Sequence, residues 1–166
     1  SGYVYQGGAK DNLTGLVWLS GKDVSVLADG NVLQELRVDS DGVLKLPKKF
    51  SKITVGLPYE SVVQTMPIEF SAQDGSYMGR KKRVSRMTIL FRDTRGGLYG
   101  VGEKRLDAIK WRSTEKYDNP IELYSGKRRV VIPGASYEDT VYLTIKQTDP
   151  LPLTILSIVP EVEAGG

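Results

Sequence analysis

Turn signals recur along the whole chain at short intervals. Asp29-Gly30, Asp41-Gly42 and Pro133-Gly134 combine residues that accept positive φ or fix a turn. The segments between such signals are short and rich in Val, Ile, Leu, Thr and Tyr, which are the residues favoured in strands. Only 75–86 and 106–111 could be helical, and neither has an apolar stripe long enough to indicate a helix. The sequence therefore predicts an all-β fold.

The first half of the chain contains enough strands to close a small barrel. Asp29-Gly30 is a strong hairpin signal because both turn positions tolerate positive φ, and Asp41-Gly42 predicts a second hairpin. Two more strands are expected at 51–57 and 59–70, separated by Pro58. The residues expected inside the barrel alternate along these strands: Val24, Val26, Ile53, Val55 and Leu57. We therefore predict a small β-barrel-like domain over residues 1–70.

The second half predicts a β-sandwich domain over residues 71–166. Six strand-like segments are expected there, at 84–92, 108–111, 121–124, 128–132, 140–147 and 153–159. The last segment is bounded by Pro150, Pro152 and Pro160. Because proline cannot donate to a strand ladder, we expect the final strand to stop at residue 159.

Two residue types that dominate enzyme chemistry are missing. The chain has no Cys and no His, which excludes a thiol nucleophile, an imidazole base, a disulfide and a Cys- or His-based metal site within it. No serine lies in a nucleophile-elbow motif. We therefore expect no catalytic, cofactor-binding or metal-binding residues and no enzymatic activity. No apolar run approaches about 18 residues, so no membrane contact is expected.

Two loops resemble ligand sites only superficially. The glycines of Gly96 to Gly102 suggest a phosphate cradle, yet no helical pattern follows them, so a flexible hairpin loop is the better interpretation. Asp39 to Gly42 resembles part of a calcium loop, but the downstream ligands are missing, and we interpret it as a turn.

Positive charge is concentrated at two places in a chain whose net charge is only +3. The residues concerned form one candidate basic patch: Arg80, Lys81, Lys82, Arg83, Arg86, Lys127, Arg128 and Arg129. Such cations could face DNA, where each phosphate contact adds affinity. They could instead lie on a solvated or inter-subunit strand edge, where charge prevents unwanted pairing, and this is the favoured interpretation. The sequence leaves both possibilities open.

Four blocks of the sequence carry a family resemblance. They are Leu19 to Gly30, Ile53 to Tyr59, Gly79 to Val84 and the Leu-Pro-Leu-Thr run at 151–154. In this order they resemble the C-terminal region of bacteriophage and prophage tail proteins similar to the short-tail nozzle (tail tubular protein B) group. The blocks are spread over most of the chain, but residues 103–120 contain none.

The resemblance implies a structural role in a virion tail and no catalytic residues or cofactors. It implies that the chain is part of a longer protein that forms a ring of copies around the DNA exit channel. The partners expected are those copies, neighbouring tail or fibre proteins, and transiently the exiting DNA. The alternative is a module that binds host-surface glycans, through some of the nine Tyr and two Trp, or nucleic acid.

Overall fold

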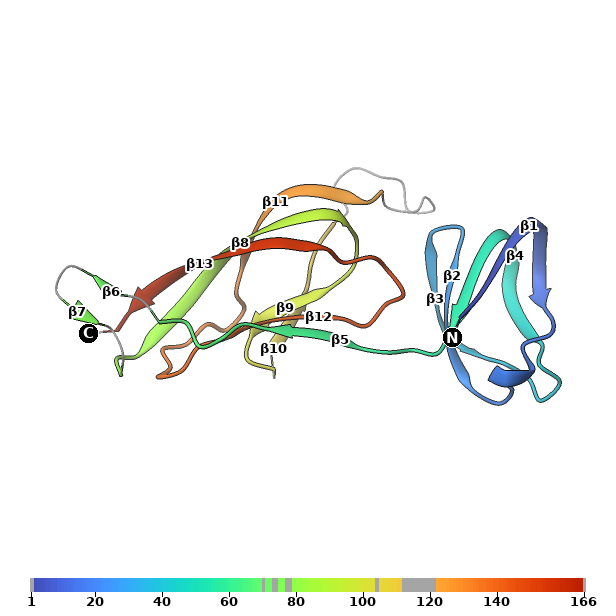
Figure 1. Cartoon of the computed structure of the whole chain (residues 1–166), viewed down its shortest axis with the longest axis horizontal. Helices are drawn as coiled ribbons and strands as arrows, with labels where there is room; N and C mark the ends of the chain where they lie inside the picture. The colour runs from blue at the N-terminus through green and yellow to red at the C-terminus, as the bar shows by residue number, and fades with distance from the viewer. Residues whose placement is uncertain are drawn as a thin grey trace. The chain divides into compact units, whose positions relative to one another are not determined.

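The computed structural model describes residues 2–69, 71–72, 75–76, 79–103, 105–111 and 122–165 (Figure 1). Within these residues the chain is built of antiparallel strands, with one short 3₁₀ helix, η1 (Val17–Leu19), and no α-helix. The predicted all-β fold is confirmed. The chain divides into two compact units, the first mainly Ser1–Glu60 and the second beginning at Ser61.

The first unit is a single four-stranded sheet with its own core. Its strands are β1 (Gly2–Leu13), β2 (Asp23–Ala28), β3 (Asn31–Arg37) and β4 (Leu44–Gly56), in the order β1-β4-β2-β3. No ladder joins β1 to β3 among the described residues, so the expected barrel closure is not seen. Of the five residues expected inside, Val24, Val26, Ile53 and Val55 are buried. Leu57 is exposed because β4 ends one residue before it.

The two predicted hairpins differ in outcome. β2 and β3 pair across Asp29-Gly30, where both residues have positive φ (45° and 78°), as the predicted hairpin requires. Asp41-Gly42 also forms a turn, in which the Gly42 N–H donates to the Asp39 carbonyl at 3.0 Å. The flanking strands β3 and β4 are not neighbours, because β2 lies between them in the sheet. The second prediction therefore identified a turn but not a hairpin.

The second unit is a sandwich of two sheets. One sheet has the order β10-β9-β12-β5, the other β11-β8-β13, and β6 and β7 form a separate two-stranded ribbon. The strand bounds are β5 Ser61–Gln64, β6 Ser71–Ala72, β7 Gly75–Ser76, β8 Lys82–Thr94, β9 Leu98–Val101, β10 Arg105–Ala108, β11 Tyr124–Val131, β12 Leu143–Gln147 and β13 Ile155–Ala164. Met87, Ile89 and Phe91 from one sheet share a buried core with Tyr99 and Ile145 from the other. Inward side chains from both sheets thus form one hydrophobic core.

Three features of the second unit differ from expectation. The sequence placed the boundary at residues 70 and 71, whereas the compact units divide at Glu60 and Ser61, because β5 pairs with β12. The Gly96–Gly102 segment contains strand β9 rather than only a flexible loop. β13 continues through Pro160, which an edge strand tolerates on its unpaired side. Residue 121, expected to begin a strand, lies outside the described residues.

Candidate functional site

Lys82 does not lie on the surface with the other residues of the predicted basic patch. It is the first residue of β8, and its side chain is fully buried. Its ammonium donates to Glu69 Oε1 at 2.6 Å and to the Ile68 carbonyl at 3.4 Å. Its backbone exchanges hydrogen bonds with Glu138. Lys82 therefore ties residues 68 and 69 to the start of β8 and is not part of an exposed patch.

Other basic residues of the patch lie on the outward side of the β11-β8-β13 sheet, next to carboxylates of β13. Strand register places Arg83 opposite Glu163 and Arg86 opposite Glu161. The nitrogen-to-oxygen distances are 3.9 Å for Arg83 to Glu163, 3.8 Å for Arg86 to Glu161 and 2.6 Å for Arg129 to Glu161. We call these five residues the mixed-charge face, because its three cations are matched by two carboxylates.

The strongest contact on the mixed-charge face joins β11 to β13. Hydrogen bonding from Arg129 lowers the pKa of Glu161 below its ordinary value, and the positive charges of Arg129 and Arg86 act in the same direction. The same hydrogen bond raises the pKa of Arg129. Both groups are therefore held in their charged forms at neutral pH, and the charge of each partly cancels the electrostatic potential of the other.

The cluster at 127–129 is divided between the two sides of its strand. Lys127 and Arg129 are exposed, whereas Arg128 points to the opposite side and is partly buried. The Arg128 guanidinium lies 5.6 Å from the Trp111 ring centre and 5.5 Å from that of Tyr124, and it donates to the Lys110 carbonyl. Arg80 and Lys81 precede β8 and are exposed. The eight predicted residues thus do not share one face.

Aromatic side chains of the second unit form a cluster next to the core. The Phe91 and Trp111 rings are 5.1 Å apart at 71°, and those of Trp111 and Tyr124 are 5.4 Å apart at 46°. The indole N–H of Trp111 donates to the Gly96 carbonyl at 2.8 Å. These rings are tilted against one another rather than coplanar, and they stabilise the fold by packing.

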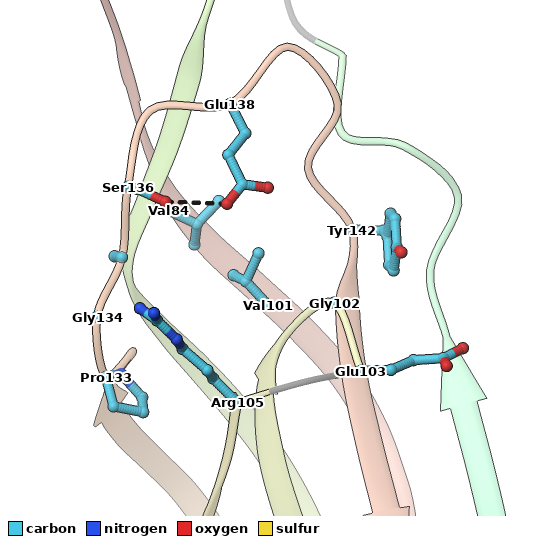
Figure 2. Close-up of a pocket in the computed structure, with 11 residues that line it drawn as sticks. Val84, Val101, Gly102, Glu103, Arg105, Pro133, Gly134, Ser136, Glu138 and Tyr142 are labelled. Carbon is cyan, nitrogen blue, oxygen red and sulfur yellow. Dashed lines mark hydrogen bonds between the residues drawn. The ribbon is translucent and has the colours of Figure 1, made fainter.

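A pocket of about 490 Å³ opens at one end of the sandwich (Figure 2). Its walls come from β8, β9, β10 and the loop between β11 and β12, and they include Val84, Val101 and Arg105. Figure 2 shows the Arg105 side chain extending across the pocket towards Gly134. Gly134 has φ +62°, and a Cβ there would lie 2.8 Å from Arg105 Nη1. The glycine therefore leaves room for the guanidinium.

The far wall of the pocket carries the opposite charge. Ser136 Oγ donates to the Glu138 carboxylate at 2.9 Å, and Tyr142 and Glu103 also line the opening. These groups can hold a small polar molecule by hydrogen bonds and charge. The sequence analysis missed this pocket, because Pro133-Gly134 could be recognised as a turn but its distant neighbour Arg105 could not.

Comparisons with known proteins assign no family: no family model matches this chain, and no curated protein matches it. In the part of the chain that the structure describes, no helix is long and apolar enough to cross a membrane. The same residues contain no group of three carboxylates placed to hold a metal ion.

Proposed function

We propose that this chain is a structural module of a bacteriophage tail protein similar to the nozzle group, assembling with copies of itself around the DNA exit channel. Four sequence blocks in the family's order support the proposal. The mixed-charge face is the structural observation that favours it most. No catalytic role is part of the proposal.

A channel wall must let DNA pass without retaining it. Three exposed cations without partners would each contact a phosphate and add to affinity. On the mixed-charge face, Glu161 and Glu163 lie within 4 Å of those cations. The carboxylates repel phosphate and compete for the guanidinium groups, so attraction to DNA is weak and is screened further by salt. Such a surface suits transient contact with moving DNA.

The alternative binding modules fit the described residues less well. A nucleic-acid-binding module would need the cations of the two basic clusters to converge without carboxylate partners. Lys82 is buried, Arg128 points away from the side occupied by Arg129, and the three cations that do converge lie next to Glu161 and Glu163. A glycan-binding module would need coplanar exposed rings, whereas the Phe91, Trp111 and Tyr124 rings are mutually tilted. We therefore favour the structural role.

Copurification with virions tests this role. Particles of the source phage, or of an induced prophage, are purified through a density gradient and probed with an antibody raised against this chain. We expect the parent protein to comigrate with intact particles at a constant ratio to capsid protein. A parent protein that remains in the soluble fraction while infectious particles band without it would refute the proposal.

A charge-matched pair of variants tests the role of the mixed-charge face. Glu161→Gln with Glu163→Gln removes both carboxylates, so we expect duplex DNA to bind more tightly. The slope of log K against log salt concentration should steepen by about 2 to 3, roughly one unit for each arginine side chain that becomes free to contact a phosphate. The control is Asp23→Asn with Asp39→Asn, which removes equal charge from exposed ion pairs of the first unit. Equal gains in both variants would show that net charge, and not this face, governs DNA contact.

A further inference from the structure

Most sheet edges in the described residues carry a feature that discourages pairing with another strand. β13 contains Pro160, and β11 carries exposed Lys127 and Arg129. In the first unit, β3 is distorted at Glu35, whose φ is +57°. Each of these devices is a known way of blocking edge-to-edge association.

β10 is blocked by charge on its core side. Its residues Arg105 and Asp107 are paired with Val101 and Tyr99, which belong to the core, so both charged side chains lie on the core-facing side of the sheet. An added strand would have to bury them.

Two edges of the four-stranded sheets carry no charge, proline or backbone distortion: strand β5 and the first five residues of β1. β5 (Ser61–Gln64) and the Gly2–Gln6 part of β1 contain no charge, no proline and no register shift. Their exposed apolar side chains are Val62 (51% exposed), Val63 (53%) and Val4 (63%). β5 lies at the edge of its sheet, beside β12 (Figure 1).

β5 also leaves part of the sandwich core uncovered. Val63 is paired with Ile145, so the two side chains lie on the same side of the sheet. Ile145 is 1% exposed, whereas Val63 remains half exposed. A further strand beside β5 would cover Val63, just as β5 covers Ile145 of β12.

Strand β5 and the Gly2–Gln6 part of β1 each have one core-facing side and one outward-facing side, and the two strands can pair with these sides matched. In β1, Tyr3 pairs with buried Val55 and packs against the core of the first unit, while Val4 points outward. In β5, Val63 is on the core side and Val62 on the outer side. An antiparallel register with Val62 opposite Val4 and Val63 opposite Tyr3 joins like faces, and aromatic with β-branched pairs are favourable across strands.

We propose that β5 of one copy of this chain pairs with β1 of the next copy, in that antiparallel register. The partner is a second copy because the complementary edges belong to the two units of the same chain. Such a contact is heterologous, and repeated copies close into a ring where the rotation permits. The inference rests on the proposed ring assembly and supplies its interface.

Cysteine crosslinking tests the pairing, because the chain has no cysteine of its own. Val62→Cys in isotope-labelled chain is mixed with Val4→Cys in unlabelled chain, oxidised mildly and read by mass spectrometry. Directly opposite positions lie within disulfide reach. The control replaces Val62→Cys with Val131→Cys, whose native valine is 63% exposed on β11.

We expect the 62-to-4 disulfide to form at least about tenfold faster than the 131-to-4 disulfide, because pairing raises the local concentration of the two thiols. Equal rates would overturn the proposal. Faster 62-to-62 or 4-to-4 crosslinking would also overturn it, in favour of a two-fold contact between identical edges. The virion experiment is independent of these outcomes: particles that contain the protein without this crosslink would retain the tail role and lose this interface.

Discussion

The ion pair between Lys82 and Glu69 should respond unequally to replacement of its two partners, because the two side chains differ in exposure. The lysine side chain is 0% exposed, whereas the glutamate side chain is 40% exposed. Replacing the carboxylate by a neutral amide leaves a buried ammonium without a counter-ion, with only neutral acceptors such as the Ile68 carbonyl at 3.4 Å. Removing the ammonium leaves a carboxylate that water already reaches. The two substitutions should therefore differ in cost although they break the same contact.

The magnitudes follow from that difference in exposure. Losing one partner of a fully buried pair costs about 3–5 kcal/mol, and losing an exposed pair costs about 0–1 kcal/mol. Because Glu69 is partly exposed, we expect Glu69→Gln to lower the free energy of unfolding by about 2 kcal/mol. Lys82→Met keeps the apolar stem and removes the buried charge, so its cost should stay below about 1 kcal/mol.

Urea unfolding of the second unit measures both values. Trp18→Phe leaves Trp111 as the only tryptophan, and Trp111 packs in the second unit. Glu69→Gln should lower the urea midpoint by about 1 M. Glu163→Gln is the matched control, since its pair with Arg83 is longer and both side chains are more than a third exposed. The reasoning is refuted if Glu69→Gln costs no more than Glu163→Gln, or if Lys82→Met costs more than Glu69→Gln.

Two further predictions concern stability. Gly100→Ala should lower the free energy of unfolding in urea by about 1–3 kcal/mol, because the added Cβ would overlap the Arg105 carbonyl oxygen. The control Gly8→Ala places its Cβ in open space and should change that free energy by less than about 0.5 kcal/mol. Similar costs for the two variants would contradict this prediction. The lowered pKa of Glu161 predicts a stabilisation that is present above the unfolded value of about 4.3 and is lost as the pH falls through the lower folded value. The stability difference between the native chain and Glu161→Gln should therefore shrink between pH 5 and pH 3, and a constant difference would disprove it.

Local turn chemistry explains why the fold class could be predicted from the sequence. Asp29-Gly30 forms its hairpin with positive φ at both turn residues, which this residue pair accepts locally. The Asp29 carboxylate also accepts hydrogen bonds from the Ser51 and Lys52 N–H groups of β4, which the sequence did not predict. The alternation of Val24 with Val26 likewise identified the buried side of β2. Barrel closure depends on whether β1 and β3 meet, and no local pattern determines that.

The candidate site was harder to predict because it depends on distant neighbours. Lys82 looks like one more surface cation until strand alternation and Glu69 are known. Glu161 neutralises Arg86 and Arg129 from a strand that is far along the chain. Gly100 looked like part of a flexible loop, yet its missing Cβ allows β10 to approach β9. The first two contacts join segments that sequence spacing cannot pair, and the third depends on the register of the β9–β10 hairpin, which local turn signals did not show.

Location on the particle is the most direct test of the proposed tail role. Virions of the source phage, or of an induced prophage, are permeabilised and labelled with antibody against this chain, then viewed by electron microscopy. The account predicts label confined to the tail of well-formed particles. Absence of label from such particles, with antibody that recognises the denatured virion protein as a positive control, would contradict the tail role and leave glycan or nucleic-acid binding as the function to examine.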